Sequence, residues 1–293
     1  MVHAVPSNLS GDFPSLLVPA SPATELIRAF LNLLGFVPTT RQETARDFLP
    51  PWRSLRRAAL KSWFNSSRET RRMFWVLKLA VSILLIVWVF RQVRKPSGPL
   101  GRRIVRAMNL SHSRMTDWGL QHLTVPKNAA ILDVGCGGGE TVRKLAALAP
   151  DGKVAGLDYS AASVAVSHNT NADDVAAGRV QILHGSVATL PFPDCTFDLV
   201  TAVETHYYWP DLPANVREIL RVLKPGGTFA LIAETYRGGP FRFVYAIIMP
   251  LLRAAFLSDA EHRDLLTQAG FAEVTTEHVS GNNWICATGR KPA

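Results

Sequence analysis

Residues 131–140 read Ile131-Leu132-Asp133-Val134-Gly135-Cys136-Gly137-Gly138-Gly139-Glu140. Apolar residues and an acid lead into a cluster of glycines, and helix-forming residues follow. This order predicts a buried strand, a tight turn and the N-terminus of a helix. Because glycine lacks a β-carbon, such a turn lets the backbone approach a ligand closely.

The spacing of the glycines bears on the kind of ligand. A dinucleotide-binding turn needs Gly-x-Gly-x-x-Gly, and its third glycine would fall on Glu140. A carboxylate at that point would repel a pyrophosphate. The pattern that fits is acid-x-Gly-x-Gly-x-Gly, from Asp133 to Gly139. An ordinary strand-to-helix loop has the same composition, so the downstream sequence has to decide.

Downstream of the turn, apolar β-forming runs alternate with helical segments. The runs predict strands at 153–160, 180–184, 197–203, 228–233, 273–277 and 283–288. This alternation predicts an α/β fold: a Rossmann-like, doubly wound, mostly parallel seven-stranded sheet with helices on both faces. Ligands of such sheets bind outside the carboxyl ends of the strands. Polar side chains expected at that edge are Asp133, Asp158, Ser186 and Glu204.

Four segments carry a resemblance to a known family. They are LDVGCGGG (132–139), GLDYS (156–160), LPFPDCTFDLV (190–200) and LKPGG (223–227). In this order and spacing, residues 100–293 resemble a class I S-adenosylmethionine-dependent methyltransferase. Within that class, the last two segments resemble the quinone-biosynthesis-like and sterol-methyltransferase-like branch, which acts on small molecules. Met108-Asn109, His112, Trp118-Gly119-Leu120 and ETHYYWPD (204–211) resemble a less characterised microbial branch.

The resemblance implies S-adenosylmethionine as cofactor and a set of residues that bind it. Gly135, Cys136 and Gly137 would contact its methionine part, and Asp133 would orient its amino group. Asp158 would accept hydrogen bonds from the ribose hydroxyls.

The remaining cofactor contacts follow from the same resemblance. Tyr159 would pack on the adenine, with Ser160 beside it, and Glu204 would serve cofactor or substrate unless it is a surface glutamate at a strand end. Many relatives have Gly-Asp-Ala after the third strand, where this chain has Gly185, Ser186 and Val187. A serine hydroxyl accepts a hydrogen bond less strongly than a carboxylate does. We therefore expect a weaker contact with the adenine.

Methyl transfer requires little acid–base chemistry, because a sulfonium methyl group is already electrophilic and positioning supplies much of the rate. A base helps if the nucleophile is a hydroxyl, a phenol or an acidic carbon. His206, just beyond the fourth strand, is the predicted base, with a positioned loop histidine as the alternative. Tyr207 is predicted to line the acceptor pocket, although Tyr207 or Tyr208 would pack instead. His112, on a helix predicted over Gly101–Leu123, either closes over the cofactor or is solvated.

The basic charge of the chain is local. Residues 41–106 carry 16 Lys and Arg against three acids, so the rest of the chain has a net charge of −4 within a total of +9. Within this region, residues 74–90 form an apolar run in which Lys78 is the only charge, with Trp75 and Trp88 near the ends. Seventeen helical residues span about 25 Å, which is the short end for a bilayer core. A membrane-spanning anchor is favoured over a core or partner-binding helix.

The chain is thus predicted to have four parts. Residues 1–72 form a poorly ordered, basic extension, 73–90 a transmembrane anchor, 91–100 a linker, and 101–293 the methyltransferase domain. The predicted location is a membrane crossed once, with the catalytic domain facing the cytosol, where the cofactor is made. The basic flanks would contact anionic lipids. No nucleic-acid-binding motif accompanies them, and no Asn/Asp-Pro-Pro-Tyr/Phe follows the fourth strand, so nucleic acid is not the expected partner.

Two further segments carry expectations. The three cysteines have no paired spacing, so neither a disulfide framework nor a zinc site is predicted, and no metal is expected. Residues 241–257 are apolar and interrupted by Pro250, which predicts two short helices that act as a substrate lid or pack on the domain. Ser258 and Glu261 have the spacing of a capping box for the next helix, expected to end at Ala269.

Together these features predict an S-adenosylmethionine-dependent methyltransferase. Its acceptor would be a small, lipophilic molecule at a membrane, methylated on oxygen or carbon. Two alternatives stay open. One is a protein methyltransferase, and the other is a catalytically silent scaffold that binds the cofactor.

Overall fold

The structure is a computed structural model, and it describes residues 68–293. The extension expected over 1–72 lies almost wholly outside the described residues. The described helices are α3 (Arg68–Arg94), α4 (Gly98–Leu120), α5 (Glu140–Leu148), α6 (Ala161–Thr170), α7 (Ala172–Ala176), the 3₁₀ turn η1 (His206–Tyr208), α8 (Leu212–Val222), α9 (Arg242–Leu251) and α10 (Asp259–Ala269). The strands are β1 (Ala130–Val134), β2 (Lys153–Asp158), β3 (Val180–His184), β4 (Phe197–Val203), β5 (Leu223–Ala233), β6 (Ala272–His278) and β7 (Ile285–Arg290).

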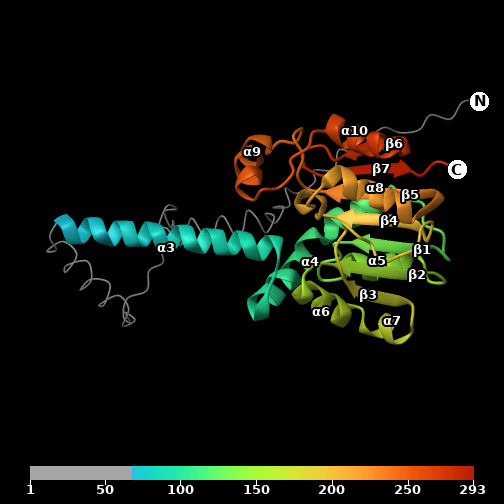
Figure 1. Ribbon diagram of the computed structural model, residues 1–293, viewed down its shortest axis with the longest axis horizontal. Helices are drawn as coiled ribbons and strands as arrows, with labels where there is room; N and C mark the ends of the chain where they lie inside the picture. The colour runs from blue at the N-terminus through green and yellow to red at the C-terminus, as the bar shows by residue number, and fades with distance from the viewer. Residues whose placement is uncertain (1–67) are drawn as a thin grey trace, which may run out of the picture. The chain divides into compact units, whose positions relative to one another are not determined.

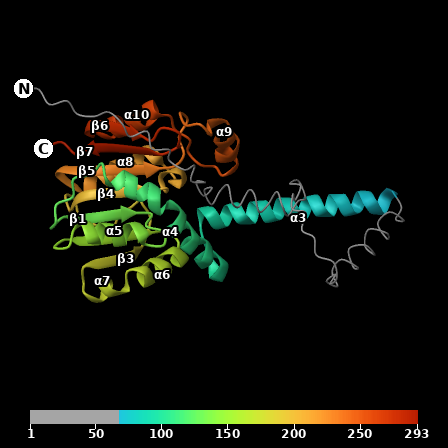
Figure 2. The same cartoon turned by 180° about the vertical axis from the view of Figure 1, so that it is seen from behind.

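The seven strands form one sheet in the order β3-β2-β1-β4-β5-β7-β6, which can be followed in Figures 1 and 2. The pairs among β1 to β5 are parallel, and β7 runs antiparallel to both β5 and β6. This arrangement confirms the mostly parallel, Rossmann-like sheet. The strand order reverses at β1, whose neighbours are β2 and β4, and a ligand crevice forms at such a point.

The side chains of β1 point alternately to the two faces of the sheet, and both faces are covered by helices. Ile131 packs in a cluster with Met115 of α4 and Leu145 of α5, whereas Leu132 packs in a second cluster with Ile219 of α8. Successive residues of a strand point to opposite faces, so a run that is apolar throughout requires cover on both sides. Ile131 and Leu132 are both fully buried. The carboxyl edge of the sheet is left open for a site.

The linker is shorter than the sequence suggests. α3 continues to Arg94 and α4 begins at Gly98, so the segment expected over 91–100 is reduced to residues 95–97. Pro96 ends α3 because the residue before a proline is disfavoured in the helical region. Pro99 lies in the first turn of α4, where its missing N–H has no helical partner to lose.

One helix in the described part of the chain is long and apolar enough to cross a membrane, judged by length and composition. It covers Arg72–Arg94, with a mean hydropathy of 2.4, and its most apolar stretch is not buried against the protein.

Two boundaries near the C-terminal half also differ from expectation. β5 begins at Leu223 and not at residue 228, because Leu223 already pairs with Phe197 of β4. The register of the two strands then shifts, and Gly226 in this stretch of β5 adopts a φ of +75°. The apolar segment after β5 forms one helix, α9, with Pro250 in its last turn. The second short helix is absent, because Arg253 adopts a left-handed φ of +51° that ends the helix. The capping box of Ser258 and Glu261 is confirmed at the start of α10.

Candidate active site at the carboxyl edge of the sheet

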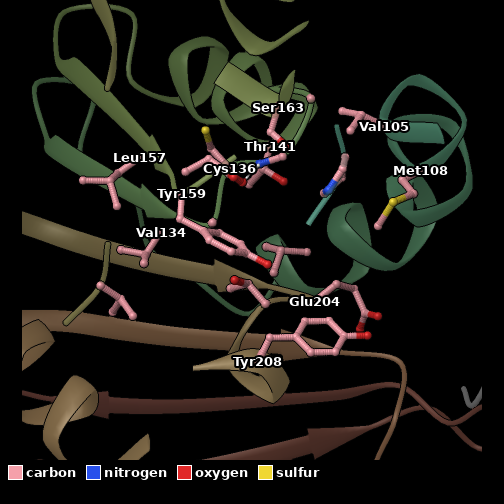
Figure 3. Close-up of a pocket in the computed structure, with 18 of the residues that line it drawn as sticks. Val105, Met108, Val134, Cys136, Thr141, Leu157, Tyr159, Ser163, Glu204 and Tyr208 are labelled. Carbon is pink, nitrogen blue, oxygen red and sulfur yellow. Dashed lines mark hydrogen bonds between the residues drawn. The ribbon is translucent and has the colours of Figure 1, made fainter. Parts of the chain in front are cut away.

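A cavity of about 350 Å³ lies beyond the carboxyl ends of β1, β2 and β4. Its wall combines the glycine turn, the loops after β2, β3 and β4, one face of α4, and the end of α3. Figure 3 shows part of this wall. Its residues include Val93, Arg94, Pro96, Met108, Asn109, His112, Gly135, Cys136, Gly137, Asp158, Tyr159, Ser186, Val187, Glu204, Tyr208 and Trp209.

The glycine turn is held against β2 and against the loop after β4. The N–H groups of Gly135 and Cys136 both donate to the carbonyl oxygen of Leu157, at 2.7 and 3.1 Å. Gly135 has a φ of +75°, and a β-carbon there would lie 2.1 Å from Oγ1 of Thr205. Only glycine satisfies both the backbone conformation and this close approach. The turn therefore presents its backbone to the cavity.

Asp158, at the end of β2, forms a hydrogen bond with the glycine turn and also lines the cavity. Its Oδ2 accepts a hydrogen bond from the N–H of Gly137 at 2.9 Å, and its Oδ1 accepts one from the N–H of Ser160 at 2.8 Å. Burial raises the pKa of the Asp158 carboxyl, and the two backbone hydrogen bonds oppose that rise. The carboxylate is thus fixed in orientation at the cavity wall.

Asp133 lies deeper than the sequence suggested. It is 1% exposed, it does not line the cavity, and its Oδ1 accepts a hydrogen bond from Thr201 Oγ1 at 2.7 Å. Burial raises the pKa of Asp133 to about 7. In this structure the Asp133 side chain links β1 to β4 inside the domain.

Tyr159 and Ser160 connect β2 to the corner between α3 and α4. The Tyr159 hydroxyl donates to the carbonyl oxygen of Arg94, and Lys95 Nζ lies 5.2 Å from the centre of the Tyr159 ring. Ser160 Oγ donates to the carbonyl oxygen of Pro96 at 2.7 Å, and Ser160 caps α6. Tyr159 lines the cavity as expected. Ser160, expected as a cofactor contact, is buried outside it.

The loop after β3 is in the expected place. Ser186 and Val187 both line the cavity, together with Cys136 of the turn. Ser186 Oγ accepts a hydrogen bond from the N–H of Ala188 at 3.2 Å.

The expectations for His206 and Tyr207 require correction. The imidazole of His206 is 1% exposed, it does not line the cavity, and neither ring nitrogen has a hydrogen-bond partner among the described residues. Burial lowers its pKa well below the ordinary value, with the nearby His262 as a smaller cause. Tyr207 is also buried away from the cavity, and Tyr208 lines it instead. Successive residues of a 3₁₀ turn diverge by about 120°, so only one of the three points inward.

Tyr207 has a structural role beneath Glu204. Its hydroxyl donates to Oε1 of Glu204 at 2.9 Å and accepts a hydrogen bond from the N–H of Thr235 at 3.1 Å. Glu204 has a left-handed backbone, with φ at +57°. The glutamate is therefore held at the cavity wall by the residue that the sequence placed in the acceptor pocket.

The face of α4 that lines the cavity carries residues whose roles the sequence analysis left open. Asn109 Nδ2 donates to the carbonyl oxygen of Gly138 at 3.0 Å and so braces the turn. The side chain of His112, 17% exposed, lines the cavity and lies 3.9 Å from Oε1 of Glu234. Donor atoms of His112, Glu204 and Glu234 lie within 4.8 Å of one another, and these residues have the chemistry to hold a metal ion. The sequence signals for this face were the helix predicted over Gly101–Leu123 and the residues Met108, Asn109 and His112 on it.

Comparisons with known proteins agree with the geometry. A family described as a methyltransferase domain matches residues 132–231. Demethylmenaquinone methyltransferase of Bacillus licheniformis is 33% identical over 152 residues, which are 50% of this chain and 64% of that protein. The Staphylococcus aureus enzyme of the same name is 32% identical over 158 residues, again 64% of its length. The chain thus spans less than two thirds of the curated relatives.

The fold is similar to solved methyltransferase structures. Human N-acetylserotonin methyltransferase in complex with S-adenosylmethionine superimposes with a TM-score of 0.55 at 19% identity, covering 66% of this chain and 56% of that one. The cavity lies at the same edge of the sheet as the glycine turn and Asp158. The methyltransferase domain match also includes that turn. Residues 132–231 match a methyltransferase domain, and the similarity to demethylmenaquinone methyltransferases supports a class I S-adenosylmethionine-dependent methyltransferase of the quinone-biosynthesis-like type.

Proposed function

We propose that this protein transfers the methyl group of S-adenosylmethionine to an oxygen or carbon atom of a small, lipophilic acceptor at a membrane. One observation carries the proposal. The same cavity is lined by the glycine turn with Asp158 and by Val93, Arg94 and Pro96 at the end of the apolar helix α3. A site for a polar cofactor and the end of a candidate membrane span therefore share one wall.

On the cofactor side, the chain offers groups that match the polar parts of the molecule. The backbone of Gly135 and Gly137 would contact the methionine part, and Asp158 would accept hydrogen bonds from the ribose hydroxyls. Tyr159, Ser186 and Val187 would surround the adenine. The bound cofactor supplies an electrophilic methyl group, and the cavity wall orients the acceptor toward it.

On the acceptor side, the wall is largely apolar. Val105 and Met108 of α4 face the cavity together with Tyr208 and Trp209 after β4. The curated relatives are named for demethylmenaquinone, a quinone. We propose that the acceptor here is likewise a small molecule with a flat or aliphatic apolar body, bound against these side chains.

The membrane part of the proposal rests on α3. The candidate span Arg72–Arg94 has 23 residues and is about 35 Å long as a helix, enough to cross a hydrocarbon core. Arg91 and Arg94 lie in its last turn, where they would contact lipid head groups. With the domain attached directly after this turn, an acceptor leaving the bilayer would meet the cavity at its edge. We place the domain on the cytosolic side, where the cofactor is made.

The test uses the full-length protein in detergent with tritiated S-adenosylmethionine and a total lipid extract. We expect label in the organic phase and a product heavier by one methyl group. Label in protein would instead identify a protein methyltransferase. Cofactor binding without labelled product in either phase would identify a silent scaffold. Asp158→Ala is the negative control for cofactor binding.

A further inference from the structure

We propose that His112, Glu204 and Glu234 bind one divalent first-row metal cation beside the acceptor part of the cavity. The cation would hold and polarise an oxygen of an acceptor that has a hydroxyl or phenol group. Binding of the cation is independent of the function proposed above, whereas its part in methyl transfer rests on that function.

Three separate elements bring the ligands together. His112 lies on α4, Glu204 directly follows β4, and Glu234 directly follows β5. Because β4 and β5 are adjacent parallel strands, their carboxyl ends meet at the same edge. The donor atoms lie within 4.8 Å of one another, and His112 Nε2 is 3.9 Å from Glu234 Oε1. That distance is too long for a direct hydrogen bond and leaves room between the groups.

The spacing is close to that of a metal site. Ligand atoms about 2.0–2.2 Å from a cation lie roughly 3–4 Å apart, so small side-chain rotations would complete the set. Three protein ligands leave coordination positions open, as catalytic metal sites do. An imidazole with two carboxylates suits Mn²⁺, Fe²⁺ or Zn²⁺. A cation here would face the cavity, because His112 and Glu204 both line it.

Glu204 is held in place by outer-shell contacts. Its Oε1 accepts hydrogen bonds from the Tyr207 hydroxyl at 2.9 Å and from the N–H of Glu234. Among the described residues, Oε2 has no hydrogen-bond partner. The left-handed φ of Glu204 is a strained backbone conformation that persists where the surroundings impose it. Such fixing of a ligand by its neighbours is typical of metal sites.

The charge at this point also requires a partner. No lysine or arginine in the described part of the chain forms an ion pair with Glu204 or Glu234. Glu204 and Glu234 present two carboxylates at one point of the wall, and like charges this close repel each other. A divalent cation neutralises both carboxylates at once.

The experiment is a titration of the metal-free, full-length protein in detergent with Mn²⁺, followed by electron paramagnetic resonance of the free ion. We expect one site per chain. His112→Gln and Glu234→Gln should each weaken Mn²⁺ binding at least tenfold. Matched controls are His168→Gln on α6 and Glu277→Gln on β6, both exposed, which should bind as the wild type does.

Two results would overturn the site. One is that none of Mn²⁺, Fe²⁺ and Zn²⁺ binds stoichiometrically to the wild type. The other is unchanged Mn²⁺ affinity in both ligand variants. Loss of methyl transfer in these variants without metal binding by the wild type would indicate an acid–base group and also reject the site.

The role in methyl transfer has its own readout. Removal of the metal with EDTA should lower the rate of methyl transfer at least tenfold, and Mn²⁺ should restore it. An unchanged rate would overturn this role. Calorimetric binding of S-adenosylmethionine, which involves other residues, tests the proposed function separately. It should persist in the metal-free protein.

Discussion

The hydroxyl of Ser160 donates a hydrogen bond to the carbonyl oxygen of Pro96 at 2.7 Å, across 64 residues of chain. Ser160 follows the strand that ends in Asp158, whereas Pro96 lies between α3 and α4. The Tyr159 hydroxyl donates to the carbonyl oxygen of Arg94 beside it. The corner that joins the apolar helix to the domain is therefore fixed on the loop that carries Asp158.

Removal of this hydrogen bond should destabilise the domain without affecting its ligand site. Ser160→Ala loses both the contact with Pro96 and the cap of α6, so we expect a loss of about 1–2 kcal/mol in the free energy of unfolding. Cofactor affinity should change less than threefold, because Ser160 does not line the cavity. Urea unfolding and calorimetry measure the two quantities. Ser111→Ala, on an exposed part of α4, is the control; a tenfold weaker cofactor affinity would contradict the placement of Ser160.

A side chain at Gly135 should be far more damaging than one at Gly178. Both glycines have φ near +70°, at +75° and +72°, but only Gly135 would place a β-carbon against Thr205, since Gly178 has open space around it. Gly178→Ala should cost about 1 kcal/mol from backbone strain alone. Gly135→Ala adds the clash and should cost at least about 2 kcal/mol more. Thermal unfolding of both variants measures this difference, and equal losses would show that the turn relaxes freely.

Loss of the Asp158 carboxylate should strongly weaken cofactor binding. Asp158→Ala removes the acceptor for the N–H groups of Gly137 and Ser160, and with it the proposed acceptor for the ribose. We expect affinity for S-adenosylmethionine to fall at least ~30-fold, about 2 kcal/mol. Calorimetric titration measures it, with Asp264→Ala on the exposed face of α10 as the control. Unchanged affinity would reject the cofactor site.

His206 should make stability depend on pH on the acid side. Burial holds its folded pKa well below the ordinary value of 6.5, so the unfolded chain binds a proton first as pH falls. The contribution of His206 is complete above pH ~6.5 and is lost progressively below it. His206→Leu should therefore unfold less readily on acidification than the wild type does. Urea unfolding at several pH values between 5 and 8 tests this; parallel curves for the two proteins would exclude His206 as the cause.

The membrane assignment of α3 can be tested by a single charge. Leu84, 68% exposed, lies near the middle of the apolar stretch, and arginine at the centre of a span costs about 2.5–3.5 kcal/mol. Leu84→Arg should move protein from the carbonate-washed membrane fraction to the supernatant, whereas Leu84→Ala should not. Cofactor affinity should stay the same in both variants. Membrane retention of the arginine variant would argue against a spanning helix.

Local sequence pattern was sufficient for most of the fold. The apolar run and glycines of residues 131–140 predicted β1, the turn and the start of α5, and the downstream runs located the other strands. Strands and turns depend on residues that are close in the chain, so the positions of glycine and β-branched residues predict them. The placement of Asp158, Ser186 and Glu204 at one edge followed from the parallel order of the strands.

Tertiary structure alone decided which side chains reach the cavity. His206, Tyr207 and Tyr208 are consecutive, yet only Tyr208 lines it, because the 3₁₀ turn directs each side chain differently. His112 and Glu234 meet Glu204 only because α4 crosses the carboxyl edge where β4 and β5 end. The glycine turn could be predicted because its residues are consecutive in the sequence. The group of His112, Glu204 and Glu234 was not, because its members share a place only after the sheet has formed.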